Sequence, residues 1–164
     1  MARLEPEYNP ILDIPPDWRL EFRGFFMGEG CVQLLRYPRK KLNVWSYRPQ
    51  LGIRLRADER PLINQILEYL GGLTTEVAKR TTKQGYTSNP SIFWYVSGWK
   101  RCRPIVEQVL LGSVLEAHKR LDLDLLHQAI LYRFTLGNRL GQEGRDKMEE
   151  FREAIMNVRK YSDC

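Results

Sequence analysis

The sequence is poor in the residues that build disulfide scaffolds and zinc sites. Its three cysteines, Cys31, Cys102 and Cys164, are odd in number and form no CxxC pair. Its two histidines, His118 and His127, are too few and too badly spaced for a histidine metal centre. These absences argue against a disulfide-stapled secreted domain and a zinc knuckle, and they favour a reducing compartment.

Long hydrophobic runs are also missing. No stretch approaches the roughly 18 apolar residues that a membrane span needs. Residues 1–7 lack the apolar core of a signal peptide. We therefore expect an intracellular protein, in the prokaryotic cytoplasm or an organelle, with no membrane partner.

Acidic residues are absent from one long stretch. The 164 residues contain 26 Lys and Arg against 20 Asp and Glu, a net charge of +6, yet positions 31–57 contain no acid. The end of this stretch alternates as a strand does, with Ile53 and Leu55 on one side and Arg54 and Arg56 on the other. A merely solvated face would mix charges of both signs, so the pattern predicts a sheet with one basic face for a polyanion.

The most informative segment is residues 20–31, LEFRGFFMGEGC. Gly24 and Gly28 lie four residues apart, so a helix would present them as a smooth strip that a second helix can approach closely. Glu29 follows at the helix end, and Gly30 is expected to end the helix with a positive φ. A carboxylate at this carbonyl-rich end opposes the helix dipole, and a divalent cation would resolve the conflict.

The rest of the chain predicts one domain with the element order αββαββα between an extended lead-in and a helical tail, and the family resemblance described next makes this unit a half-domain. The lead-in is 1–17, the domain is 18–134 and the tail is 135–164. Asp17 and Asp58 are expected to cap the first two helices, and Met148, Phe151 and Ile155 form a helical stripe in the tail. The predicted elements are a helix 18–30, strands 31–39 and 45–57, a helix 59–70, strands 74–82 and 92–99, and helices 103–111 and 114–134.

Phe22 to Gly30 resembles the LAGLIDADG motif of homing endonucleases. Six positions fit its "GFFxGEG" form, and Arg23 and Met27 depart from it. The resemblance implies an α+β fold, with a four-stranded antiparallel saddle-shaped sheet, helices on one face and an additional C-terminal helix. No second copy of the motif is present, so it also implies a homodimer in which Gly24, Phe25 and Gly28 meet their symmetry mates.

The resemblance further implies an intron-encoded endonuclease that makes a metal-dependent double-strand break in a long, pseudo-palindromic double-stranded DNA site. Glu29 and the Gly28 backbone carbonyl would bind Mg²⁺; Mn²⁺ is expected to substitute for it, and Ca²⁺ is expected to support binding only. Lys119 or His118 would stabilise charge on the phosphate. Ala57 stands where the family often has a polar residue that orders water, and Arg56 or Asp58 are the candidates to replace it.

The outward residues of the strands are the candidates for DNA contact. Arginine and glutamine suit bidentate reading of guanine and adenine, whereas lysines in loops suit phosphates. The candidates are Gln33, Tyr37, Arg39, Lys40, Lys41, Arg48, Gln50, Arg54, Arg56, Arg80, Lys83 and Tyr95. Two alternatives stay open on the same fold: a maturase that binds intron RNA, and a DNA-binding protein that has lost catalysis.

Overall fold

The computed structural model describes residues 4–112, 118–137 and 139–159. Its element order follows the predicted helix, two strands, helix, second hairpin and helices, but the second hairpin contains four strands and not two. The elements are α1 (Pro16–Glu29), β1 (Gly30–Arg39), the 3-10 helix η1 (Lys40–Leu42), β2 (Val44–Arg56), the 3-10 helix η2 (Ala57–Glu59), α2 (Arg60–Leu70), β3 (Leu73–Val77), β4 (Arg80–Thr81), β5 (Thr87–Ser88), β6 (Ser91–Ser97), α3 (Trp99–Ile105), the π-helix η3 (Val106–Leu110), α4 (His118–Thr135) and α5 (Gln142–Arg159).

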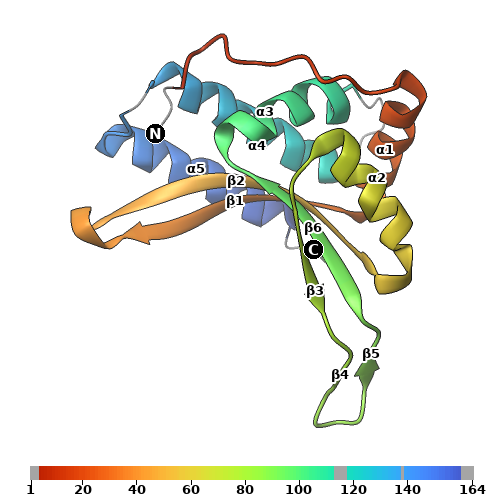
Figure 1. Ribbon diagram of the computed structural model, residues 1–164. Coiled ribbons are helices and arrows are strands. Elements are labelled where there is room, and N and C mark those ends of the chain that lie inside the picture. The colour runs from red at the N-terminus through yellow and green to blue at the C-terminus, as the bar shows by residue number, and fades with distance from the viewer. Residues whose placement is uncertain (1–3, 113–117, 138, 160–164) are drawn as a thin grey trace.

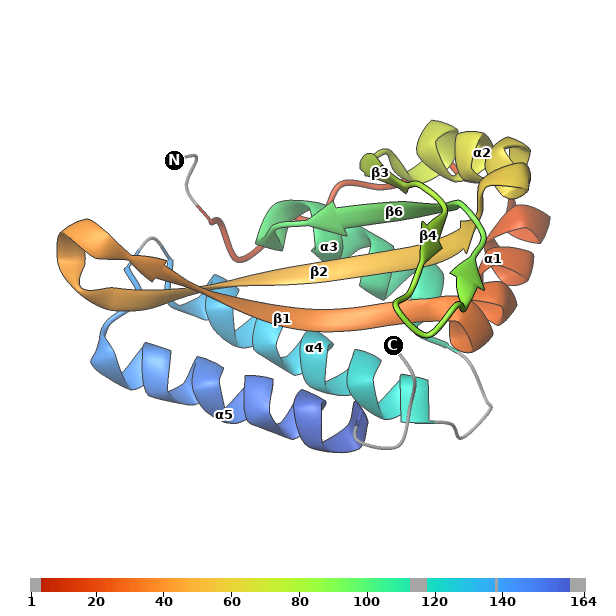
Figure 2. The same ribbon diagram turned by 90° about the horizontal axis from the view of Figure 1, so that it is seen from below.

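Four strands form one antiparallel sheet in the order β1-β2-β6-β3. Figure 1 shows α1, α3 and α4 above the sheet and α5 behind the β1–β2 hairpin, and the view from below in Figure 2 shows β1 and β2 in front of α4 and α3. One face of these strands is therefore covered by helices and the other is left open. This confirms the predicted α+β fold with a four-stranded antiparallel sheet.

The core lies between the sheet and these helices. Leu51 and Ile53 of β2 and Trp94 of β6 are fully buried, and they face the buried Phe22 and Phe26 of α1. Each such side chain contributes about 1.5–3 kcal/mol through burial of apolar surface. Because side chains alternate along a strand, the burial of these residues leaves their neighbours on the open face.

Both predicted aspartate caps are wrong. The residue that precedes α1 is Pro15, and Asp17 lies inside the first turn, where proline and an acid are both favourable. Asp58 lies in η2, and its carboxylate forms an ion pair with Arg56 at 2.8 Å instead of capping α2. The Asp58 carboxylate is thus paired with the last residue of β2 and forms no cap on α2.

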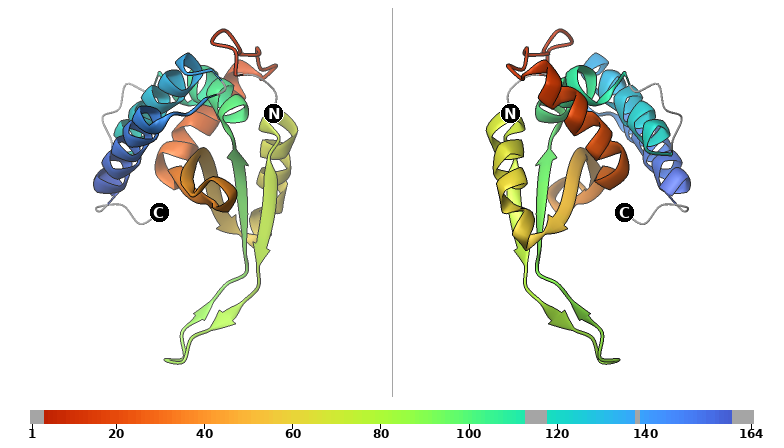
Figure 3. Two further views of the ribbon diagram at one scale, coloured as in Figure 1. Left: turned by 90° about the vertical axis from the view of Figure 1, so that its left-hand side faces the viewer. Right: turned by 90° about the vertical axis from the view of Figure 1, so that its right-hand side faces the viewer.

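The second hairpin also differs from the prediction. The expected strand 74–82 is divided into β3 and the short β4, and β4 pairs only with β5. Residues 78–90, here called the arm, extend away from the rest of the molecule (Figure 3). The next helix begins at Trp99, four residues before the expected start, and its last turn is the π-helix η3. Positions 114–117 of the helix predicted at 114–134 lie outside the described residues.

Helix α5 packs against the rest of the fold. Met148 and Ile155 of the predicted stripe are buried in the same core as the sheet, and the Phe151 ring lies 6.3 Å from that of Tyr132 in α4. In the part of the chain that the structure describes, no helix combines the length and hydrophobicity of a membrane span.

Candidate nucleic-acid interface and catalytic centre

The exposed side of α1 is an open strip that ends at a carboxylate. A Cβ atom added at Gly24 or Gly28 would meet no atom within 4 Å apart from those of its chain neighbours and of the adjacent helix backbone. Leu20, one turn before Gly24, is 61% exposed, and Glu29 is exposed at the helix end. An apolar residue and two glycines thus form one line along the helix and leave its backbone accessible.

Gly30 does not adopt the predicted positive φ. Its angles are φ −75° and ψ 157°, so the chain passes directly from α1 into β1 in an extended conformation. A Cβ at this position would lie 2.5 Å from the Phe26 ring. Glycine is required here for close packing rather than for a left-handed turn, and this packing holds Glu29 at the junction of helix and sheet.

Arg23 points away from the open strip. Its Nε donates a hydrogen bond of 2.7 Å to the Val109 carbonyl in η3. Met27, the other departure from the motif, is partly buried against the core. Both unusual residues are therefore accommodated within the chain, and neither obstructs the glycine strip.

The structure brings Lys119 to the end of the motif. Lys119 is 9% exposed, and its Nζ donates to the carbonyl oxygen of Gly30, the residue after Glu29. His118 is the first residue of α4, but its side chain lies outside the described part of the molecule. Of the two predicted catalytic cations, the structure thus places the Lys119 ammonium at the backbone carbonyl of Gly30, the residue after Glu29.

The predicted reading residues of β1 and β2 share the open face of the sheet. The register places Gln33 opposite Gln50, and these side chains are only partly buried. Arg48 and Arg54 are exposed on the same face. Residues of this face from the predicted set are Gln33, Tyr37, Arg39, Arg48, Gln50, Arg54, Arg56 and Tyr95.

Phe93 is a member of this face that the sequence reasoning missed. Its ring stacks on Tyr95 at 5.5 Å, and the Arg54 guanidinium lies 5.7 Å from its centre. The signal was available, because the buried Ile92 and Trp94 place the residue between them on the opposite face.

The remaining predicted DNA contacts lie outside the four-stranded sheet. Lys40 and Lys41 are exposed in η1, at the tip of the β1–β2 hairpin. Arg80 and Lys83 are exposed on the arm. Both tips therefore carry cations at the ends of extended hairpins.

The residue that follows β2 is Ala57, which has no polar side chain at the position where the family often has a water-ordering residue. Ala57 is half-buried, and its backbone N–H donates to the Pro90 carbonyl at 2.9 Å. Its neighbours Arg56 and Asp58 form their ion pair in solvent. Arg56 therefore has an acidic partner within the chain, whereas Arg54 lies over an aromatic ring.

The described residues contain no group of three or more His, Cys, Asp or Glu side chains that could hold a metal ion. Glu29 is an exposed carboxylate on the last residue of α1, next to the carbonyls of the helix end. Carboxylate and carbonyl oxygens are the hard ligands that Mg²⁺ prefers, but Mg²⁺ takes six ligands and often more than one carboxylate. The donor type of Glu29 and the neighbouring carbonyls therefore fits Mg²⁺.

Comparison with known families now identifies the chain. The model described as LAGLIDADG endonuclease matches residues 22–128. The chain belongs to the LAGLIDADG endonuclease family. The match spans the motif, the sheet and Lys119, and it ends before α5.

Solved structures of homing endonucleases share the fold. The homing endonuclease I-TnaI has a TM-score of 0.63 and 16% identity, over 91% of this chain and 98% of that one. I-CvuI in complex with its target in the presence of calcium has a TM-score of 0.54 and 17% identity, over 87% and 92%. The meganuclease I-SmaMI bound to uncleavable DNA has a TM-score of 0.62 and 19% identity, over 86% and 45%, so this chain spans about half of its length. A comparison with curated proteins finds no match.

Proposed function

We propose that two copies of this chain form a homing endonuclease that binds a long pseudo-palindromic DNA site and hydrolyses one phosphodiester bond in each strand. The exposed Glu29 at the end of the open glycine strip is the observation that carries this proposal. It combines a surface that a second helix can approach with a carboxylate at the point of approach.

The glycine strip supports the homodimer. Gly24 and Gly28 leave the α1 backbone bare, and Leu20 exposes apolar surface beside them. Helix backbones approach closely where side chains are smallest, and a two-fold axis places the same strip on both partners. Two Glu29 carboxylates would then meet at the axis, where one chain alone offers one carboxylate.

The helix-end oxygens support a divalent cation. Glu29 and the Gly28 backbone carbonyl from each chain would bind Mg²⁺ or Mn²⁺, and Ca²⁺ would permit binding without cleavage. A bound divalent cation makes water more acidic and stabilises charge on the phosphate and the leaving oxygen. Glu29 acts as a ligand in this proposal, and not as the general base.

Lys119 supports the same assignment. Its ammonium group is held at the Gly30 carbonyl, one residue from Glu29. From this position we propose that it stabilises negative charge that develops on the scissile phosphate. The ammonium also offsets the negative end of the α1 dipole next to the Glu29 carboxylate.

The open sheet face supports DNA as the ligand. It carries arginine and glutamine side chains, and the strands β1 and β2 contain no acid. Extended side chains of these types read base edges in the major groove, and the loop cations Lys40, Lys41 and Lys83 suit phosphate contacts. Relatives with this fold are described as bound to DNA, namely I-CvuI and I-SmaMI.

Selection of cleaved sites from a randomised double-stranded DNA library with Mg²⁺ tests the proposal. The wild type should enrich a two-fold-related site, and Glu29→Gln should lose cleavage while it still binds that site. Glu21→Gln is the matched control, because it removes an exposed carboxylate from the same helix. Cleavage by Glu29→Gln near the wild-type rate would show that the centre lies elsewhere.

The dimer has its own test. Wild-type protein should sediment as a dimer at micromolar concentration, and Gly24→Leu should be monomeric because a bulky side chain separates the helices. Gly141→Leu is the control, since a Cβ there also meets nothing within 4 Å but lies outside α1. A monomeric wild type would remove the basis for a symmetric enzyme.

Ala57 favours a second function, which is DNA binding without cleavage. It supplies no polar side chain where a water-ordering residue is expected, and the adjacent Arg56 and Asp58 are paired with each other. Enrichment of bound sites without any cut sites would select this alternative. Enrichment of an RNA over every DNA in a parallel RNA library would select the maturase.

A further inference from the structure

The outer half of the β1–β2 hairpin extends beyond the rest of the sheet. The register pairs β2 with β6 only from Gln50 to Arg56. Residues 44–48 pair with 35–39 of β1 and have no third strand on the ladder. A two-stranded ribbon is marginally stable by itself, so this part of the hairpin needs support from outside the sheet.

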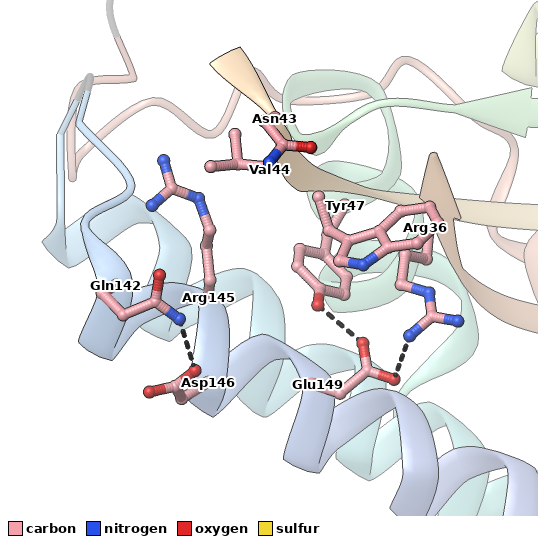
Figure 4. Close-up of a pocket in the computed structure, with 9 residues that line it drawn as sticks. Arg36, Asn43, Val44, Tyr47, Gln142, Arg145, Asp146 and Glu149 are labelled. Atoms are coloured by element: carbon pink, nitrogen blue, oxygen red, sulfur yellow. Dashed lines mark hydrogen bonds and ion pairs between the residues drawn. The ribbon is translucent and has the colours of Figure 1, made fainter. Parts of the chain in front are cut away.

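Glu149 of α5 provides such support. Arg36 and Tyr47 are directly opposite each other in the register, so they are a cross-strand pair. The Arg36 Nη1 lies 3.1 Å from Glu149 Oε1, and the Tyr47 hydroxyl donates to Glu149 Oε2 at 2.6 Å (Figure 4). Arg152, one turn further along α5, donates to the same carboxylate at 2.8 Å. One side chain therefore connects both strands of the hairpin to the helix.

The electrostatics make this contact persistent at neutral pH. Burial raises the pKa of the Tyr47 hydroxyl, and its bond to Glu149 raises it further. Burial also raises the pKa of Glu149, but the bond from Tyr47 and the charges of Arg152 and Arg36 outweigh it and leave the pKa below its ordinary value. Tyr47 thus remains the donor and Glu149 the ionised acceptor.

The pair lies directly behind two candidate reading residues. Arg36 and Tyr47 face α5, so their chain neighbours Tyr37 and Arg48 point to the open face. The Arg48 guanidinium lies 5.5 Å from the centre of the Tyr37 ring. The position of these two side chains follows from the path of the ribbon, which Glu149 holds from the other side.

The position of the Glu149 contact along the hairpin determines which base pairs of the site it would affect. Ile53 is opposite Gly30, so Arg54 lies near the motif end of the sheet, and Arg48 lies further from it. In a dimer with its axis at α1, Arg54 would contact base pairs near the centre of the site. Tyr37 and Arg48 would contact base pairs nearer its outer ends.

We propose that Glu149 is a positioning residue that sets base preference at the outer positions of each half-site, by holding the Arg36–Tyr47 pair against α5. This inference rests on the proposed DNA-reading function. It assigns to α5, which lies beyond the family match, a role in specificity and none in chemistry.

The test compares position-resolved site profiles from a randomised DNA library for the wild type, Glu149→Ala and Tyr47→Phe. In both variants, base discrimination at the outer positions of the site should fall about fivefold, and the base preferences at the inner positions should remain those of the wild type. Tyr47→Phe keeps the buried ring and removes only the hydroxyl. Glu150→Ala is the matched control, since this exposed neighbour pairs with Lys147 of its own helix, and its profile should be that of the wild type.

Hydrogen exchange of the free proteins provides a measurement that needs no DNA. Glu149→Ala should accelerate amide exchange in 35–48 and leave β6 unchanged. An unchanged profile in both variants, or an equal loss at inner and outer positions, would overturn the proposal. If the wild type selects no preferred DNA sequence, the DNA-reading function is refuted, and with it the role of Glu149 in specificity. The hydrogen-exchange result would then report only on the structural contact between Glu149 and the hairpin.

Discussion

Two hairpins extend from the sheet, and they differ in what supports them. The β1–β2 hairpin has a helix behind it, with Tyr47 6% exposed and joined to Glu149. In the arm, every residue from 78 to 90 is exposed, and its two strands β4 and β5 are two residues long. Both are free of acids, and the arm carries three cations among its 13 residues.

The difference in support suggests different uses for the two basic hairpins, base reading for the first and phosphate contact for the second. A hairpin with one buried face has its outward side chains in place before a ligand arrives, which suits base reading. A hairpin without a buried face gains little from folding alone, so we expect contact with a ligand to order it. Arginine and glutamine dominate the open face of the first, whereas lysine, threonine and serine are frequent in the second, and side chains of these types are suited to phosphate contact.

The largest expected effect is on the free energy of unfolding, which should respond to a substitution beneath the first hairpin but not to one on the arm. Met148→Ala should lower the free energy of unfolding by about 2–5 kcal/mol, because this fully buried side chain anchors α5 beneath the first hairpin. Tyr86→Ala on the arm, where the side chain is 74% exposed, should change it by no more than about 0.5 kcal/mol. Urea denaturation of both variants checks this. Equal losses would mean that the arm is also part of the folded core.

A smaller effect is expected on DNA binding, where base-reading residues and phosphate-contacting residues should respond differently to substitution. Arg54→Ala should lose about 1–3 kcal/mol of binding free energy at one base pair per half-site and relax the preference there. Lys83→Ala on the arm, like Lys40→Ala or Lys41→Ala at the hairpin tip, should weaken binding evenly across sequences and reduce its salt dependence. Binding titrations against single-base variants of the site at two salt concentrations measure both. If Arg54→Ala leaves the sequence profile unchanged, the open face is not the reading surface.

The smallest effect is a pH dependence of the first hairpin's support. The pKa of Glu149 is lower in the folded state than its ordinary value, so its ionised form contributes stability above the unfolded pKa, near pH 4, and this contribution is lost as pH falls through the folded pKa. Relative to wild type, Glu149→Gln should cost about 1 kcal/mol at pH 7, and the difference should shrink below about pH 4. Glu150→Gln should show no such difference. A cost for Glu149→Gln that is constant from pH 7 to pH 3 would contradict this account of the carboxylate.

Local signals in the sequence failed where a competing partner lay nearby in space. Asp58 has the residue type of a cap, but the Arg56 guanidinium two residues earlier takes its carboxylate. Gly30 has the residue type of a left-handed helix end, but the Phe26 ring, and not the backbone angle, excludes a side chain there. In both cases a neighbouring side chain, and not the local backbone position, determines what the residue does.

The sequence by itself determined the two faces of the sheet and the motif that carries Glu29. The alternation of apolar and basic residues along β2 has the two-residue period of a strand, so it identifies the buried and open faces without knowledge of any partner. The tertiary structure alone decided which distant groups support them. It joins Arg23 to Val109 across 86 positions, Lys119 to Gly30 across 89 and Arg36 to Glu149 across 113. No local period encodes such contacts, because they depend on how α4, α5 and η3 pack against the sheet.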